Sequence, residues 1–295
     1  MPLRIVSLGD SIVWGQGLSE ADKFDVLVRD ALADANPGIT LWRLAHSGTV
    51  IGVNPVEGSP ADGEVPMPQP TIIQQCDNFN DSPETVDLVL LDGGINDVDV
   101  RTILNPFVPF PILIAKTRNF CHASMLVLLR KTVTRFSKPD CKIRVTGYYP
   151  IVSAQSHFPS VIDLLGCHGI MAPDFIDKNV LVRAVIDRCE KFFSESTASI
   201  EQAVAEAGDA RIAYVDPGFT DANSVFAPQT LLWGLKDDLD LSPEDEVANA
   251  RRASCNAAFD ELQIVEREEC YRASAGHPNV LGAKQFAQKI LESLA

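Results

Sequence analysis

Apolar runs alternate along the chain with longer segments whose apolar residues recur at helical spacing. Runs rich in Val, Ile and Leu predict strands at Leu3–Leu8, Ile39–Leu44, Val86–Asp92, Lys142–Tyr148 and Arg211–Val215. Helical spacing predicts helices at Ala21–Ala35, Thr71–Asn78, Pro111–Arg135, Asp177–Ala207, Ser242–Cys270 and Pro278–Leu294. Such alternation is typical of a parallel sheet, and because the strands are apolar throughout, helices should cover both of its faces.

Two stretches rich in Pro, Gly, Asn and Asp predict surface loops rather than linkers between domains: Asn54–Pro70 and Asp216–Leu241. Residues 1–295 are therefore expected to form a single domain. Open α/β sheets bind ligands at the carboxyl ends of their strands, so both loops could line a pocket. The apolar stretch Pro111–Arg135 is interpreted as a core helix in preference to a channel for an acyl chain.

Charge and composition narrow the classes of partner. The chain has 40 acidic and 25 basic residues, for a formal net charge of −15. A surface this acidic repels phosphate backbones and anionic lipids, so nucleic-acid binding is not expected. Neither a P-loop nor a GxGxxG segment opens the first helix, which argues against a nucleotide cofactor.

No segment is typical of a secretion signal or a membrane span. The first apolar run begins almost directly after Met1, which leaves no room for a basic region followed by an apolar leader. The most apolar later stretch, 107–129, is interrupted by prolines and charged residues and is too polar to cross a bilayer. We therefore expect a cytoplasmic protein without a transmembrane segment.

Seven cysteines are scattered along the chain without a CxxC pair. This pattern favours reduced, mostly buried thiols over a disulfide framework, particularly in the cytoplasm. The one pair to consider for a bridge is Cys255 and Cys270, which bracket a predicted helix. No metal site is expected either, because no HxH or HExxH spacing occurs among His46, His122, His157 and His168.

Polar residues follow the first two predicted strands. Ser11, in Gly9-Asp10-Ser11, stands where its hydroxyl and its backbone N–H would face the ligand-binding edge of the sheet. Serine at such a point is also a common helix cap, and on this segment alone that alternative is favoured. Gly48, after the second strand, could offer its N–H to a substrate or could mark a plain turn.

Two further segments follow the third strand and precede the last helix. The Asn96 amide could stabilise an oxyanion without carrying a charge into the site, although Asn-Asp after two glycines is also turn chemistry. The neutral imidazole of His277 is the proton acceptor that a serine hydroxyl needs. We expect these four segments to converge on one edge of the sheet.

In this order, Gly9-Asp10-Ser11, Ser47-Gly48, Gly94-Ile95-Asn96-Asp97 and His277-Pro278 resemble the four sequence blocks of the SGNH/GDSL hydrolases. The resemblance runs from Gly9 to Pro278, nearly the whole chain. It implies a three-layer α/β/α, flavodoxin-like fold with a five-stranded parallel sheet in the strand order 2-1-3-4-5.

The same resemblance implies a carboxylic ester hydrolase with Ser11 as nucleophile and His277 as base. The backbone N–H groups of Ser11 and Gly48, together with the Asn96 side chain, would form the oxyanion hole. Asp10 is expected to support the turn around Ser11 through hydrogen bonds. The substrate would be a small-molecule or lipid-like ester, and no cofactor would be needed.

One position departs from the family's pattern. The family usually has Asp three residues before the histidine, where this chain has Ser274. Either the Ser274 hydroxyl or a backbone carbonyl orients His277 in a Ser–His dyad, or a carboxylate arrives from elsewhere in the chain. Two other functions remain open: acyl transfer to an alcohol by the same residues, and a non-catalytic binding domain on the same scaffold.

Overall fold

The computed structural model describes residues 2–52, 63–66, 69–171, 173, 175–236, 243–260 and 262–295. A parallel sheet in the order β2-β1-β3-β4-β5 lies at its centre. The strands are β1 (Arg4–Leu8), β2 (Thr40–Arg43), β3 (Leu88–Leu91), β4 (Lys142–Thr146) and β5 (Ile212–Val215). Val6 of β1 lies opposite Trp42 on one side and Val89 on the other. The fold class and the strand order expected from the sequence are confirmed.

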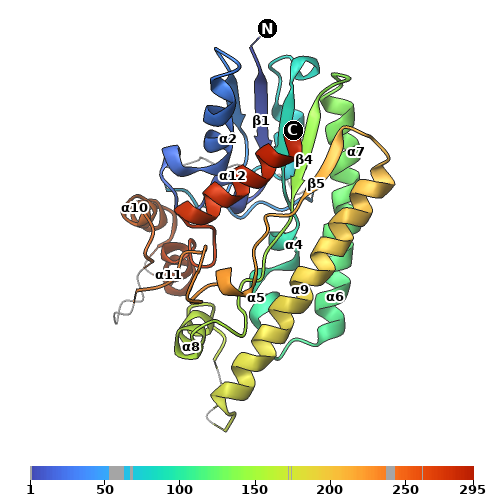
Figure 1. The fold of residues 1–295 in the computed structure, drawn as a ribbon. Coiled ribbons are helices and arrows are strands. Elements are labelled where there is room, and N and C mark those ends of the chain that lie inside the picture. Colours follow the sequence, from blue (N-terminus) through green and yellow to red (C-terminus); the bar gives the residue numbers. More distant parts are fainter. Residues whose placement is uncertain are drawn as a thin grey trace.

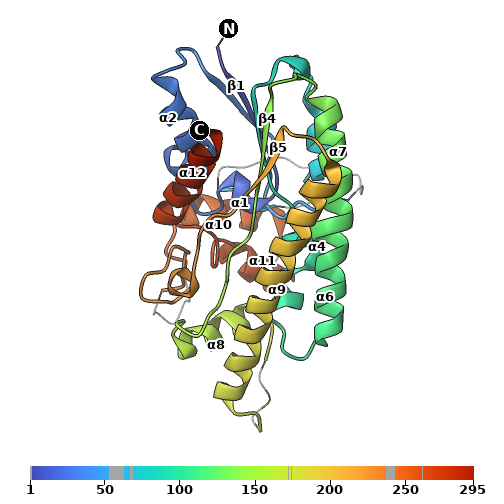
Figure 2. The same ribbon diagram turned by 45° about the vertical axis from the view of Figure 1, so that its right-hand side comes forward.

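Helices cover both faces of the sheet, which gives three layers (Figures 1 and 2). On one face, α2 (Phe24–Ala33) packs against α12 (Val280–Leu294), and α12 also contacts β4 and β5. On the other face lie α3 (Ile72–Asn78), α7 (Met125–Arg135) and α9 (Lys178–Ala207). Because both faces are covered, the strands between them are apolar on both sides.

The other described helices gather toward the carboxyl ends of the strands (Figure 1). They are α1 (Ser11–Trp14), α4 (Ile95–Val98), α5 (Val100–Leu104), α6 (Phe110–Arg118), α8 (Phe158–Cys167), α10 (Ala248–Ala258) and α11 (Ile264–Tyr271). The chain leaves β1 for β2 on one side and returns to β3 on the other. The carboxyl end of β1 is thus the switch point at which open α/β sheets bind ligands.

All five predicted strands are present, each slightly shorter than predicted. The predicted start of the last helix at Pro278 is wrong. Asn279 caps α12 by accepting hydrogen bonds from the N–H groups of Leu281 and Gly282, so the helix begins at Val280. Pro278 instead forms an isolated antiparallel bridge with Leu232.

The prediction of one helix over Ser242–Cys270 is also wrong. Ser242 lies outside the described residues, and the chain from Ala248 forms two helices, of which α10 ends at Ala258 and α11 begins at Ile264. The Asp260 carboxylate accepts from the N–H groups of Leu262 and Gln263, a local pattern that competes with helix formation. The sequence pattern did not predict α8.

The predicted helix Pro111–Arg135 runs as α6, a π-helical segment at Asn119–Ser124, and α7. By length and composition alone it could cross a membrane. In the fold it packs along α9. Leu113, Met125 and Leu128 are fully buried there and belong to the hydrophobic core. The expected absence of a membrane span remains a prediction.

A disulfide joins Cys255 of α10 to Cys270 of α11, although the cysteine pattern led us to expect reduced thiols. In one continuous helix these residues, 15 positions apart, would be separated by about 22 Å. Because α10 and α11 are separate helices that pack against each other, the two sulfur atoms can meet. The remaining cysteines are free.

Removing this bridge should lower the free energy of unfolding by about 3 kcal/mol, the value for a closed loop of this length. Urea unfolding of Cys255→Ser/Cys270→Ser measures the loss. Cys167→Ser is the control, since Cys167 is free and only partly buried. An equal loss in both variants would mean that thiol packing, not the bridge, is the stabilising feature.

Candidate active site

Ser11 stands at the carboxyl end of β1, as the first residue of α1. The helix cap is Asp10, whose carboxylate accepts a hydrogen bond from the N–H of Ile12 at 2.9 Å. Ser11 is therefore not the residue that caps the helix. Its own N–H has no hydrogen-bond partner among the described residues, as expected for the first turn of a helix.

Ser11 and His277 meet although 266 residues separate them: the serine Oγ lies 2.7 Å from the imidazole Nε2. Burial, together with the positive charge of Arg251, lowers the pKa of His277 to about 4. At neutral pH the imidazole is therefore uncharged. It can accept the hydroxyl proton, which is the role of a general base.

Backbone contacts hold the loop that carries His277. The N–H of His277 donates to the carbonyl of Ser274 at 2.8 Å, and Gly276 has φ +80°, so residues 274–277 form a type II turn. The His277 carbonyl accepts from the N–H of Trp233 at 2.7 Å. The Tyr149 hydroxyl donates to the Gly276 carbonyl at 3.0 Å. These contacts place the imidazole at the edge of the sheet.

The Ser274 hydroxyl does not hold the imidazole, which excludes one of the two groups expected to orient it in a Ser–His dyad. It donates to the Asp245 carboxylate at 2.5 Å and accepts from Arg251 at 3.4 Å. Nδ1 of His277 is buried and has no hydrogen bond among the described residues. The physical reason is competition, because an ionised carboxylate is a stronger partner for a hydroxyl than a neutral ring nitrogen.

Thr49, which follows Gly48 in the chain, connects the Gly48 loop to Asn96 by a hydrogen bond. The Asn96 amide donates to the Thr49 carbonyl at 2.9 Å, which leaves its second hydrogen available. The Thr49 hydroxyl donates to the Gly9 carbonyl at 3.0 Å, which ties this loop to the end of β1. Among the described residues the N–H of Gly48 has no partner. Three free donors thus belong to segments that are bonded to one another.

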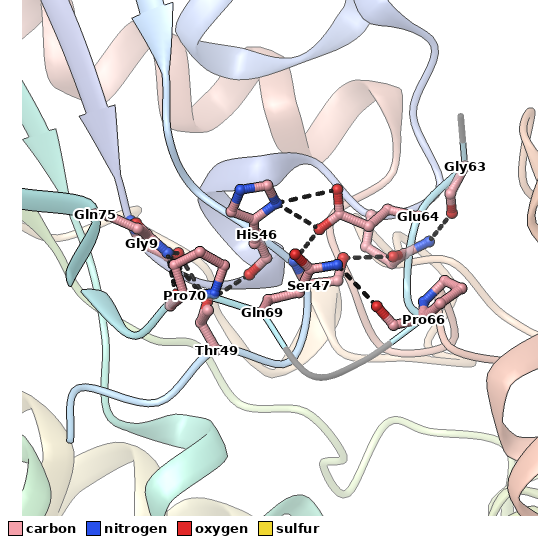
Figure 3. Close-up of polar contacts among 11 residues, drawn as sticks. Gly9, His46, Ser47, Thr49, Gly63, Glu64, Pro66, Gln69, Pro70 and Gln75 are labelled. Atoms are coloured by element: carbon pink, nitrogen blue, oxygen red, sulfur yellow. Dashed lines mark hydrogen bonds and ion pairs between the residues drawn. The ribbon is translucent and has the colours of Figure 1, made fainter. Parts of the chain in front are cut away.

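A polar network fixes the backbone on either side of Gly48 (Figure 3). Buried Glu64 accepts from the N–H of Ser47 at 2.6 Å and lies 3.2 Å from Nδ1 of His46. The Ser47 hydroxyl donates to Gln16, and Gln75 exchanges hydrogen bonds with both backbone groups of Gly9. Such contacts preorganise the loop, so that its N–H groups need no rearrangement to bind an anion.

Two buried carboxyl groups contact the backbone on either side of Ser11. Asp92, which directly follows β3, accepts a hydrogen bond from the N–H of Asp10 at 2.8 Å. A side chain at position 9 would clash with the same carboxylate oxygen, because a Cβ on Gly9 would lie 2.0 Å from it. Burial raises the pKa of Asp10 to about 6, and burial with the Asp10 charge raises that of Asp92 well above its ordinary value.

Sequence reasoning missed Glu64, Asp92, Asp245 and Arg251. Asp92 offered a signal, because it directly follows a buried strand, but the other three come from loops or a helix with no motif. The two loops expected to line a pocket lie partly outside the described residues. Among the described residues no group of three or more His, Cys, Asp or Glu side chains could hold a metal ion.

No protein-family model matches the chain, and no curated protein matches it in sequence. Several solved structures are similar to the chain in fold. A lipase from a goat rumen metagenome is similar at a TM-score of 0.53 and 12% identity, over 99% of this chain and 97% of the lipase. An acetyl xylan esterase from Geobacillus stearothermophilus is similar at a TM-score of 0.43 and 14% identity, over 99% and 94%. The likeness to the lipase shows a shared fold.

Proposed function

We propose that the protein hydrolyses carboxylic esters through an acyl-enzyme on Ser11, in the manner of the SGNH/GDSL hydrolases. The observation that carries the proposal is the contact of 2.7 Å between the Ser11 hydroxyl and Nε2 of His277, at the switch point of the sheet. A neutral imidazole paired with a serine hydroxyl is the arrangement that makes this weak nucleophile reactive.

The reaction proceeds in two steps. In the first, Ser11 Oγ attacks the ester carbonyl while His277 takes its proton, and the histidine then protonates the departing alcohol. In the second, His277 takes a proton from water, the resulting hydroxide attacks the acyl-serine, and the carboxylic acid leaves as Ser11 regains its proton. Both steps use only side chains of this protein, so the mechanism requires no cofactor.

Each step passes through a tetrahedral intermediate with a negative oxygen. The N–H groups of Ser11 and Gly48 and the Asn96 amide are proposed to donate to that oxygen. Among the described residues the N–H groups of Ser11 and Gly48 have no other partner, and the Asn96 amide has one hydrogen left beside its bond to Thr49, which supports this role. We further propose that residues 1–295 act as one domain on a small-molecule or lipid-like ester. A hydrophobic core that includes residues from β1 to α12 supports that view.

The test combines a panel of p-nitrophenyl esters with a fluorophosphonate probe that labels activated serines. Hydrolysis and labelling together support the proposal. Labelling with acyl transfer to an added alcohol, but without release of the acid to water, would replace hydrolysis by acyl transfer. The absence of both turnover and labelling would identify a non-catalytic binding domain.

The pH dependence offers a separate prediction. We expect kcat/KM to stay constant as the pH falls through 6.5 and to decline with a midpoint near pH 4, because His277 stays neutral until its lowered pKa is reached. A pH–rate profile measures this, with near-UV circular dichroism at each pH to follow the fold. A midpoint near 6.5 would show that water solvates the imidazole fully.

A further inference from the structure

The carboxylate that is missing from the sequence before His277 has a counterpart nearby in space. Ser274 and His277 are the first and last residues of one turn, so whatever binds the Ser274 side chain lies beside the base. The group bound there is the Asp245 carboxylate, 2.5 Å from the hydroxyl. Asp245 belongs to a different segment, 29 residues earlier and just before α10.

Asp245 is held rigidly in this place. Its side chain is completely buried, and Arg251 of α10, also completely buried, grips both carboxylate oxygens at 3.0 and 2.6 Å. Arg251 in turn donates to the Tyr271 carbonyl at 3.1 Å, which fastens the pair to the end of α11. The next residue, Glu246, donates its N–H to the Gly17 carbonyl at 3.1 Å, beyond the end of α1.

Two charges act on the imidazole. Arg251 lowers the pKa of His277 and Asp245 raises it, while burial is the main cause of its low value. Nδ1 of His277 has no hydrogen bond among the described residues. The backbone of Ser274 and Ala275 lies near the ring and raises the pKa of His277, and no side-chain carboxylate in the described part of the chain accepts a hydrogen bond from Nδ1. The remaining favourable charge in the vicinity is that of Asp245.

We propose that Asp245 is the positioning carboxylate of the Ser11–His277 pair: it fixes the histidine turn through the Ser274 hydroxyl and supplies the negative charge that favours the imidazolium formed during the reaction. Arg251 sets how much of this charge the imidazole experiences. The inference rests on the proposed function and replaces the dyad with a relay in which a serine stands between the acid and the base.

A purely structural ion pair is the competing explanation, and the protein contains a matched example. Asp25 in α2 is also completely buried, pairs with Arg43 at 2.6 Å, and accepts from the hydroxyl of Ser7 at 2.9 Å. Asp25→Asn therefore reports what the loss of such a carboxylate does to stability alone. It should lower the melting temperature and leave the pKa of His277 unchanged.

The experiment measures the pKa of His277 by NMR titration and kcat/KM on a p-nitrophenyl ester in each variant. Asp245→Asn should lower the pKa of His277, because an opposite charge is lost, and reduce kcat/KM by about 10- to 100-fold, as for other groups that orient a functional histidine. Asp245→Asn/Arg251→Met removes both buried charges, which protects the fold, and should remain similarly impaired.

The exchange Asp245→Ser/Ser274→Asp moves the carboxylate to the position beside the histidine while Arg251 keeps a partner. It should raise the pKa of His277 above the wild-type value and recover most of the lost kcat/KM. Ser274→Asp alone is less informative, since it would set two carboxylates against each other.

Wild-type kcat/KM and an unchanged pKa of His277 in both Asp245→Asn and the double variant would overturn the inference. So would an exchange variant that fails to raise the pKa. The titration requires no substrate, so the two proposals can fail separately. If the wild-type protein hydrolyses no ester, the proposed function fails; if it hydrolyses esters and the Asp245 variants match it, only the positioning role fails.

Discussion

Ser11→Ala should reduce ester hydrolysis by about 10⁴-fold or more, because loss of the nucleophile removes the covalent route that the other groups serve. The melting temperature should change by no more than a few degrees. Among the described residues the Ser11 hydroxyl has a hydrogen bond with His277 alone, and Asp10 caps α1. Steady-state kinetics with a p-nitrophenyl ester and differential scanning calorimetry measure the two effects.

Ser7→Ala is the matched control, since Ser7 is a buried serine of β1, four residues before Ser11, and its hydroxyl donates to Asp25. It should show the opposite result, a lower melting temperature with activity retained by the folded protein. Residual hydrolysis by Ser11→Ala close to the wild-type rate would exclude Ser11 as nucleophile. A collapse of the fold would instead assign the serine a structural role.

Asn96→Ala should lower kcat by roughly 10² to 10³ and leave KM nearly unchanged, since an oxyanion forms only in the transition state. The substitution also leaves the Thr49 carbonyl without the hydrogen bond it now accepts. Asn96 is only partly buried, so water can replace that bond, and the effect on stability should be small.

Asn96→Asp tests the same role with a side chain of equal size. It replaces the amide donor with an acceptor, and a negative carboxylate would repel the oxyanion, so kcat should fall at least as far as in Asn96→Ala. Should either variant raise KM while kcat stays constant, Asn96 binds the substrate in its ground state and takes no part in stabilising the intermediate.

The fold could be predicted from the sequence because its signals are local. The strands are short segments rich in Val, Ile and Leu, of which Leu88–Leu91 is wholly apolar, and each long helix repeats its apolar positions over several turns. Element boundaries failed where a side chain overrides periodicity. Asn279 moved the start of α12 by capping it, and Asp260 divided one predicted helix into two. The disulfide, which joins the one pair that the sequence offered for a bridge, follows from that division.

The site residues likewise fall into those that the sequence predicts and those that it does not. Ser11, Gly48, Asn96 and His277 stand at strand ends or in the last loop, where position along the chain indicates position in space. Asp245 could not be found, because nothing in its own segment marks it as a neighbour of residue 274. Its place depends on the reversal between α10 and α11 and on a buried partner, and both are properties of the folded chain.

The separation of 266 residues between Ser11 and His277 has a consequence for the newly made chain. At a synthesis rate of about 5–20 residues per second, a ribosome needs roughly 15–50 s to travel from the serine to the histidine. In the proposed mechanism Ser11 has no base during that time, and a chain that stops before residue 277 never gains one. Catalytic competence therefore requires that the first strand and the last loop have both been made and docked, and the onset of hydrolysis during translation would report the moment at which the last helix packs against the sheet.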